Sequence, residues 1–160
     1  MPPRRPDQTE AAAGLAAVAP LATRWIERVL AQHDPPLTVP QYLALRAIER
    51  EGVSGTELAR RSGVSVPAVS QLIAALAGAG LVEREPSEGD RRRVTLTLSR
   101  AGRRAYQGAE KALGKELGSL LSDLPRPEAD ALARLLPRVE SALSGAAPPR
   151  RPAHPPPPPH

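Results

Sequence analysis

The chain has 160 residues, a formal net charge of +5 and no cysteine. The lack of cysteine excludes disulfides, thiolate zinc sites and cysteine-based redox sensing, and no apolar run approaches the roughly 18 residues of a membrane-spanning helix. The length predicts one domain, and the basic balance favours a polyanionic partner such as nucleic acid, although a membrane surface would fit too. Because the N-terminus has no apolar signal core, we expect a cytoplasmic protein.

The sequence up to residue 50 predicts two amphipathic helices. Apolar residues recur at helical spacing in the first, which spans about residues 9–32. Thr38 and Gln41 stand at capping-box spacing and open the second, which reaches Arg50. The residues expected on the apolar sides of the two helices are Leu15, Val18, Leu21, Ala22, Trp25 and Val29, then Tyr42, Leu43, Leu45 and Ile48.

Residues 54–78 predict two further helices joined by a tight turn. Ser54 begins a capping-box pattern, and Gly63 is expected to end the first helix. Ser65 then caps the second helix, with Pro67 in its first turn. The side chains expected to face inward are Leu58, Ala59, Val64, Val69, Leu72, Ile73 and Leu76. This is the layout of a helix-turn-helix, although well-capped helical hairpins also occur in proteins that do not bind DNA.

A basic β-hairpin is predicted directly after these helices. Leu81–Arg84 and Val94–Leu98 are expected to be its strands, and Pro86–Asp90 carries turn residues. Arginine binds phosphates bidentately and enters narrow minor grooves. Arginines stand together at the predicted hairpin tip, as Arg91, Arg92 and Arg93. A helix-turn-helix followed by such a hairpin predicts a winged helix-turn-helix.

The remaining sequence predicts two more helices. Ser99 is expected to cap a long helix that reaches about Ser122, and Pro125 and Pro127 separate it from a last helix. The apolar residues of these helices are Leu113, Leu117, Leu120, Leu121 and Leu124, then Leu132, Leu135, Leu136, Val139 and Leu143. Together with the first helix they form more apolar surface than one small domain covers, which favours a homodimer over helices that pack only on their own subunit.

At this point the chain resembles the MarR family of bacterial transcription regulators. The matching residues are the Leu-Ala…Val core of the helix-turn-helix, Gly80-Leu81-Val82-Glu83-Arg84 before the hairpin, Asp90-Arg91-Arg92 in it, and Leu96-Thr97-Leu98-Ser99-x-x-Gly102 after it. The resemblance extends more loosely over residues 11–143 and does not cover the proline-rich end.

The resemblance implies roles for several residues. Arg92 would reach into the minor groove, while Asp90 would hold the wing in shape by pairing with a neighbouring arginine; the alternative is a solvated turn with a weak surface ion pair. A dimer with interleaved first and last helices would place two recognition helices about 34–36 Å apart on a pseudo-palindrome. Relatives also bind small aromatic or anionic ligands between the dimer helices and the DNA-binding domain. The residues that would line such a cleft are Trp25, His33, Tyr42 and Arg46, each of which also has an ordinary structural explanation.

The residues predicted to contact DNA fall into two groups. Phosphate contacts would make affinity fall steeply with salt, and their candidates are Arg60, Arg61, Arg91, Arg92 and Arg93. Base edges in the major groove would meet the start and outer face of the second helix, at Ser65, Pro67, Ser70 and Gln71. A carboxamide pairs bidentately with adenine, which favours Gln71, and Pro67 or Ala68 would contact a thymine methyl group. Because this helix has no Arg or Lys, we expect modest base readout and heavy reliance on the wing and on DNA shape.

We therefore expect a mainly α-helical protein with a small β-hairpin wing, without a cofactor or metal. The expected parts are a disordered N-terminus at 1–8, dimerisation helices at 9–34 and 105–145, the winged helix-turn-helix at 35–104, and a disordered proline-rich tail at 146–160. An enzyme is disfavoured because no nucleophile–base set or phosphate loop is recognisable. The open alternative is a winged helix that contacts protein, with its tail as a ligand for an aromatic groove.

Overall fold

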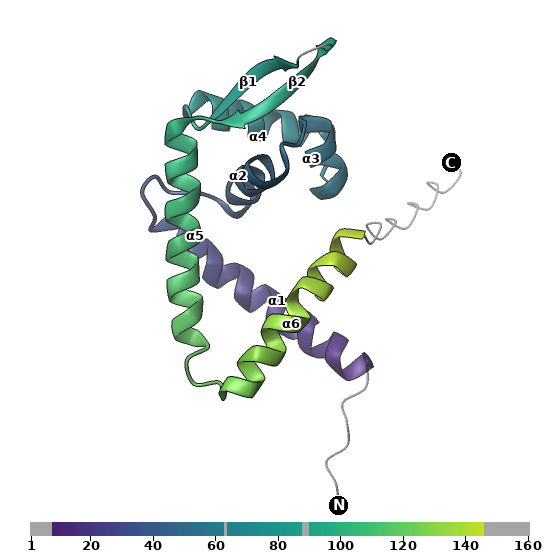
Figure 1. The fold of residues 1–160 in the computed structure, drawn as a ribbon, viewed down its shortest axis with the longest axis vertical. Coiled ribbons are helices and arrows are strands. Elements are labelled where there is room, and N and C mark those ends of the chain that lie inside the picture. Colours follow the sequence, from purple (N-terminus) through teal and green to yellow (C-terminus); the bar gives the residue numbers. More distant parts are fainter. Residues whose placement is uncertain (1–7, 63, 88–89, 146–160) are drawn as a thin grey trace, which may run out of the picture.

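The computed structural model describes residues 8–62, 64–87 and 90–145. In these ranges the chain forms helices and one antiparallel hairpin (Figure 1). The elements in order are α1 Gln8–Ala31, α2 Val39–Glu51, α3 Gly55–Ser62, α4 Val66–Gly78, β1 Val82–Ser87, β2 Asp90–Leu98, α5 Arg100–Leu120 and α6 Arg126–Gly145. This is the winged helix-turn-helix with additional terminal helices that the sequence predicts. No helix within the described ranges is both long enough and apolar enough to cross a membrane.

One apolar core holds α2, α3, α4, α5 and the hairpin together, and the end of α1 packs against it. The hairpin crosses above α4 and α2, and α5 runs from its base along one side of the molecule (Figure 1). Leu30 of α1, Leu45 of α2 and Leu76 of α4 are fully buried. The core therefore fixes the helix-turn-helix and the hairpin relative to each other within a single chain.

The helix ends follow the predicted capping residues. The Gln41 N–H donates to Thr38 Oγ1 at 3.3 Å and the Thr38 N–H donates to Gln41 Oε1 at 2.9 Å, which completes the capping box of α2. Ser54 and Ser65 accept backbone N–H groups at the starts of α3 and α4. Gly63, expected to end α3, lies outside the described residues.

The end of α4 is a Schellman motif that turns the chain into the hairpin. Gly80 has a φ of 70°, and its N–H donates to the Ala77 carbonyl at 2.9 Å. The Leu81 N–H donates to the Leu76 carbonyl at 2.9 Å. A glycine fits this left-handed position without strain, so Gly80 sets the direction in which β1 leaves the helix.

The hairpin is longer than predicted, because Pro86, Ser87 and Asp90, expected in the turn, belong to its strands. Pro86 pairs with Val94, and the next residue, Ser87, pairs with Asp90. Between these pairs β1 advances by one residue and β2 by four, so the backbone of Arg91–Arg93 forms an irregular stretch of β2 instead of the tip. Proline has no N–H to donate, which explains why the regular ladder breaks at Pro86.

Two inward-facing predictions are also wrong. Leu43 is 48% exposed, because α2 turns Ala44, Leu45 and Ile48 toward the core instead. Val64 is 46% exposed, because the contact between α3 and α4 is made by residues within the helices rather than by the turn. A Cβ on Gly55 would lie 3.0 Å from Ile73 Cδ1, which shows how closely the two helices approach there.

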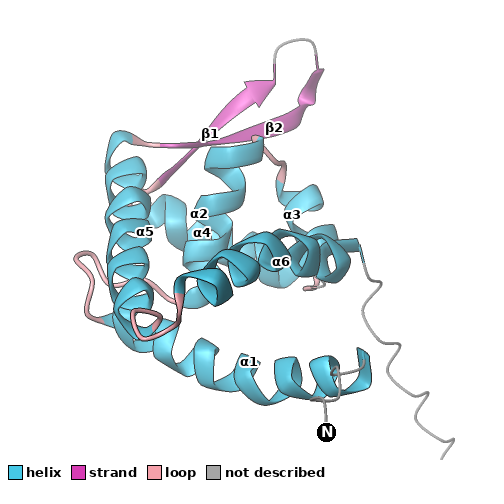
Figure 2. Cartoon of the chain, turned by 60° about the horizontal axis from the view of Figure 1, so that its bottom comes forward, coloured by secondary structure: helices cyan, strands magenta, loops and turns pink. Residues whose placement is uncertain are grey.

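The terminal helices leave the core. α1 extends away from the helix-turn-helix and the hairpin beyond its buried end, and α6 returns from the far end of α5 (Figures 1 and 2). Every residue of 11–20 in α1 is exposed. Large apolar side chains are exposed on these segments at Leu15, Val18, Leu21, Leu120, Leu121, Leu135, Leu136 and Leu143. The excess of apolar surface predicted for these helices is therefore present in the single chain.

Candidate nucleic-acid interface

Helix α4 presents a solvent-exposed face opposite its core contacts. Val69, Ile73 and Leu76 are buried and hold the helix against α2, α3 and β1. Ser65, Pro67, Ser70 and Gln71, the predicted base-contacting residues, are all exposed. The Ser65 Oγ accepts the Ala68 N–H at 3.4 Å, so part of its hydrogen-bonding capacity serves the helix cap. Ser70 and Gln71 remain as exposed polar side chains of the helix.

Arg60 of α3 forms an ion pair within its own helix. Its Nε and Nη2 donate to the two carboxylate oxygens of Glu57 at 2.9 and 2.7 Å. The hydrogen bonds to Arg60 lower the pKa of Glu57, and those to Glu57 raise the pKa of Arg60. Exposed pairs of this kind contribute little free energy and exchange readily, so Arg60 remains available to a phosphate. The side chain of Arg61 lies outside the described residues.

For residues 90–93 of the wing, the structure describes the backbone. Asp90 and Arg91–Arg93 belong to β2, but their side chains lie outside the described residues, as does the ion pair expected between Asp90 and an arginine. Arg84, on β1, is exposed, and its cross-strand partner is Leu96. The structure thus places the predicted cationic residues on β2, the second strand of the hairpin that follows α4.

The base of the wing is joined to α4 and α5 by Ser99. The Gly102 N–H donates to Ser99 Oγ at 2.9 Å, and the Ser99 hydroxyl donates to the Gly80 carbonyl at 2.6 Å. A Cβ at Gly102 would lie 1.9 Å from the Leu81 carbonyl oxygen, so only glycine allows this approach. The prediction that Ser99 caps α5 is confirmed, and its second contact sets the position of the hairpin.

A polar cluster between α2 and α5, which we call the α2–α5 cluster, was not predicted. It consists of Arg50, Tyr106 and Glu110. The Arg50 Nη2 donates to Glu110 Oε1 at 2.7 Å, its Nε donates to Tyr106 Oη at 3.2 Å, and the Tyr106 hydroxyl donates to the same Glu110 oxygen at 2.8 Å. Burial, assisted by the Glu110 carboxylate, raises the pKa of Tyr106. No local pattern reveals these partners, because Arg50 is 56 and 60 residues away from them in the sequence.

The predicted ligand residues all have partners in the fold. Tyr42 packs on Tyr106 with 5.9 Å between ring centroids, and Trp25 packs against the apolar core. His33 Nδ1 lies 3.0 Å from the Pro35 carbonyl oxygen, and its ring sits against Gly108. Tyr42 and Arg46 both lie on α2, whereas His33 and Trp25 make packing contacts.

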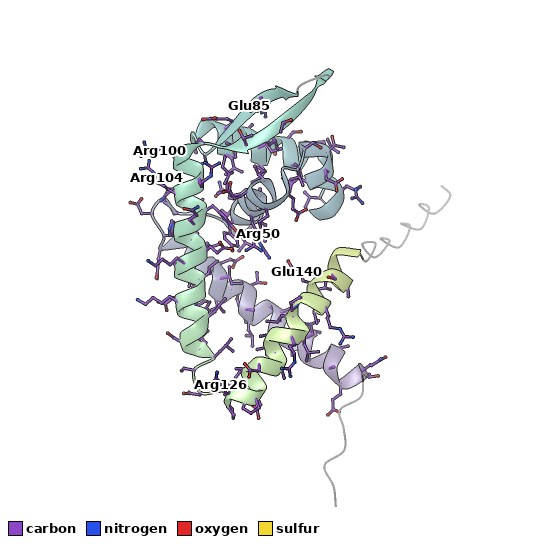
Figure 3. The ribbon with its side chains drawn as sticks, viewed as in Figure 1. Arg50, Glu85, Arg100, Arg104, Arg126 and Glu140 are labelled. Carbon is purple, nitrogen blue, oxygen red and sulfur yellow. The ribbon has the colours of Figure 1, made fainter. Side chains whose placement is uncertain are left out.

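Arg46, the remaining predicted ligand residue, links α2 to α6. Its Nη2 lies 2.9 Å from Glu140 Oε1, and Figure 3 shows Glu140 on the side of α6 that faces the DNA-binding elements. Among the described residues no group of histidine and acidic side chains is arranged to hold a metal ion.

Comparisons with known proteins agree on one family. A sequence model described as MarR family matches residues 36–93. An HTH-type transcriptional regulator of Mycobacterium bovis is 33% identical over 123 residues, which are 75% of this chain and 86% of the relative. An HTH-type transcriptional repressor of Mycobacterium tuberculosis is 30% identical over 106 residues, or 66% of this chain and 76% of the relative.

Solved structures repeat the fold. The M. tuberculosis repressor, a MarR family protein solved in complex with p-aminosalicylic acid, has a TM-score of 0.66 at 25% identity and covers 81% of this chain and 97% of its own. A mutant MarR from Escherichia coli complexed with operator DNA has a TM-score of 0.61 at 24% identity, and the match covers 83% of this chain and 98% of the E. coli chain.

Proposed function

Since the chain belongs to the MarR family of DNA-binding transcription regulators, we propose that it acts as a homodimeric repressor that a small aromatic anion releases from its operator. The observation that carries this proposal is the exposed face of α4, which the buried Val69, Ile73 and Leu76 hold beside a basic hairpin. In this scheme residues 35–104 bind DNA, and residues 9–34 and 105–145 form the dimer.

The DNA contacts divide between the two elements. Gln71 and Ser70 would contact base edges, with Ser65 and Pro67 at the start of the helix. Arg92 would enter the minor groove with Asp90 supporting the wing. Phosphate contacts would come from Arg60, Arg61, Arg91 and Arg93. This division makes affinity depend mainly on the wing and base preference mainly on α4.

Dimerisation is supported by the exposed apolar side chains of the terminal helices. Leu135, Leu136 and Leu143 of α6 are 51%, 53% and 63% exposed, and Leu15 and Leu21 of α1 are also exposed. Exposed apolar surface of this extent marks an interface. A second copy supplies the matching surface, and the resulting two-fold symmetry would place two α4 helices about one DNA turn apart on a pseudo-palindromic operator.

Ligand release is supported by the chemistry around Arg46. The relative named a repressor is solved with p-aminosalicylic acid, which joins a carboxylate to an aromatic ring. Arg46 already binds the carboxylate of Glu140, and an aromatic acid would replace it there. Tyr42 and Trp25 would contact the ring, and His33 would lie at the edge of the site. Binding between α2 and the dimer helices would change the spacing of the two α4 helices.

The DNA assignment is tested by the affinity of variants for a duplex selected from random DNA and for a scrambled duplex. Arg92→Ala should weaken both and lower the slope of log K against log salt by about 1. Gln71→Ala should instead relax base preference, by about 1–3 kcal/mol at one position. Arg126→Ala, which removes a charge from α6, is the matched control and should change neither. Normal binding by Arg92→Ala would contradict the wing assignment, and no salt-sensitive binding at all would favour a protein-contact module.

The effector assignment is tested by titrating p-aminosalicylate into the protein–DNA complex. The expected result is release of the DNA by the wild-type protein and a weaker response from Arg46→Gln. If no release occurs at concentrations that leave the fold intact, the protein does not respond to p-aminosalicylate.

A further inference from the structure

Two apolar side chains at the start of α4 take no part in the core. Val64, in the turn before the helix, is 46% exposed, and Val66, its first residue, is 56% exposed. The neighbouring Pro67 and Ala68 are exposed as well. The other exposed large apolar residues cluster on α1, the end of α5 and α6, apart from Leu43 on α2. The patch at the start of α4 is therefore separate from the surface that we assign to the dimer.

This patch replaces the polar groups that usually recognise bases. Helix α4 contains no charged residue, and its polar side chains are Ser70 and Gln71 alone. Ser65, just before the helix, already accepts the Ala68 N–H. Most of the surface that α4 presents at its start is thus apolar, in a helix whose proposed position is the major groove.

We propose that Val66, assisted by Val64, recognises thymine methyl groups and makes them determinants of the operator sequence. The C5-methyl of thymine is the apolar group that base edges present in the major groove. Contact between it and an exposed valine removes apolar surface of both partners from water. The inference rests on the proposed function, because it requires α4 to lie in the major groove.

The size of the effect follows from the size of the group. Burial of one methyl group contributes about 0.8 kcal/mol, which corresponds to a roughly fourfold change in the dissociation constant. Replacing a contacted thymine by uracil should therefore weaken binding about fourfold, because uracil lacks only the methyl group and keeps every hydrogen-bonding atom.

The test uses the full chain and a duplex selected from random double-stranded DNA. Each thymine of one half-site is replaced by uracil in turn, and the dissociation constant is measured for the wild-type protein and for Val66→Ala and Val64→Ala. The expected result is one or two positions with a roughly fourfold loss, which disappears in Val66→Ala and becomes smaller in Val64→Ala. Leu43→Ala, a similarly exposed leucine on α2 at 48%, is the matched control and should keep the full uracil penalty.

The outcomes separate this inference from the proposed function. Because Val64 and Val66 are exposed, their alanine variants should unfold at the wild-type temperature, which a thermal melt checks. Salt-sensitive binding to the selected duplex with no uracil position above a twofold loss overturns the inference and leaves the proposed function intact. A uracil penalty that persists unchanged in Val66→Ala also overturns it. Failure to bind or select any duplex overturns both.

Discussion

The DNA-binding elements and the terminal helices of this chain are built in opposite ways. The first are held by residues that are almost entirely buried, such as Leu45 and Leu76, and by serine and threonine caps at each helix start. The terminal helices leave residues such as Leu21 and Leu136 exposed, at 59% and 53%. One region completes its core within the chain, whereas the other leaves large apolar side chains exposed, which we propose a second copy covers. Stability of the monomer and the proposed assembly therefore depend on different segments, and variants can separate them.

The largest effect is expected from opening a cavity in the DNA-binding region. Leu76→Ala removes a side chain with 0% exposure, and such changes cost about 2–5 kcal/mol of unfolding free energy. Urea denaturation at several protein concentrations measures this. The control is Leu43→Ala, whose exposed side chain should cost less than about 0.5 kcal/mol. Similar losses in the two variants would remove the distinction between buried and exposed leucines.

A smaller loss is expected where the wing meets α5. Gly102→Ala places a Cβ 1.9 Å from the Leu81 carbonyl oxygen, and relieving such a clash costs about 1–3 kcal/mol. Since the backbone of β1 must move, DNA affinity should fall together with the unfolding free energy. Gly114→Ala is the matched control, because a Cβ there meets nothing within 4 Å and the helix should gain stability. Unchanged stability and affinity in Gly102→Ala would show that the junction is not tight.

Substitutions in the terminal helices should change the association of the dimer rather than the stability of the monomer. Leu136→Lys places a charge on an exposed position of α6, so the monomer fold loses no core contact. We expect the dimer to dissociate at least tenfold more readily, about 1.4 kcal/mol, as measured by sedimentation. Glu128→Gln, at an exposed position of the same helix, adds the same charge of +1 without changing an apolar side chain and is the matched control. If Leu136→Lys remained a wild-type dimer, α6 would lie outside the interface.

The smallest effect is expected in the α2–α5 cluster. Tyr106→Phe removes hydrogen bonds to Arg50 and Glu110 and should cost about 0.5–1.5 kcal/mol at neutral pH. The pKa of Tyr106 is raised in the folded chain, so its contribution is complete below the unfolded value near 10 and falls as pH rises through the folded pKa. The unfolding free energy, measured by denaturation at several pH values between about 8 and 11, should therefore fall less steeply with pH for Tyr106→Phe than for the wild type. Parallel curves would show that the hydroxyl does not ionise differently in the two states.

Local sequence patterns were sufficient to predict the helices and their caps. Thr38, Ser65 and Ser99 each stand where a backbone N–H needs an acceptor, and such needs are visible within four residues of sequence. The buried face of α4 likewise follows from helical spacing.

Features that depend on distant residues could not be predicted in this way. The irregular pairing at Pro86 depends on how two strands meet, and the exposure of Val64 depends on how α3 and α4 approach each other. Arg50 and Arg46 have partners on α5 and α6 that no spacing rule connects to α2. The base-contacting role of Gln71 and the ligand role of Arg46 remain predictions, because each concerns a molecule other than the chain itself.

Ser99 connects the end of α4, the start of β1 and the start of α5. Its hydroxyl and N–H bond to the carbonyls of Gly80 and Leu81, where α4 ends and β1 begins, while its Oγ also starts α5. A rotation of α5 would therefore move the end of α4 and the start of the wing together, because Ser99 is bonded to both. Under the proposed function, an effector that tilts α5 in the dimer would act on both elements without touching either.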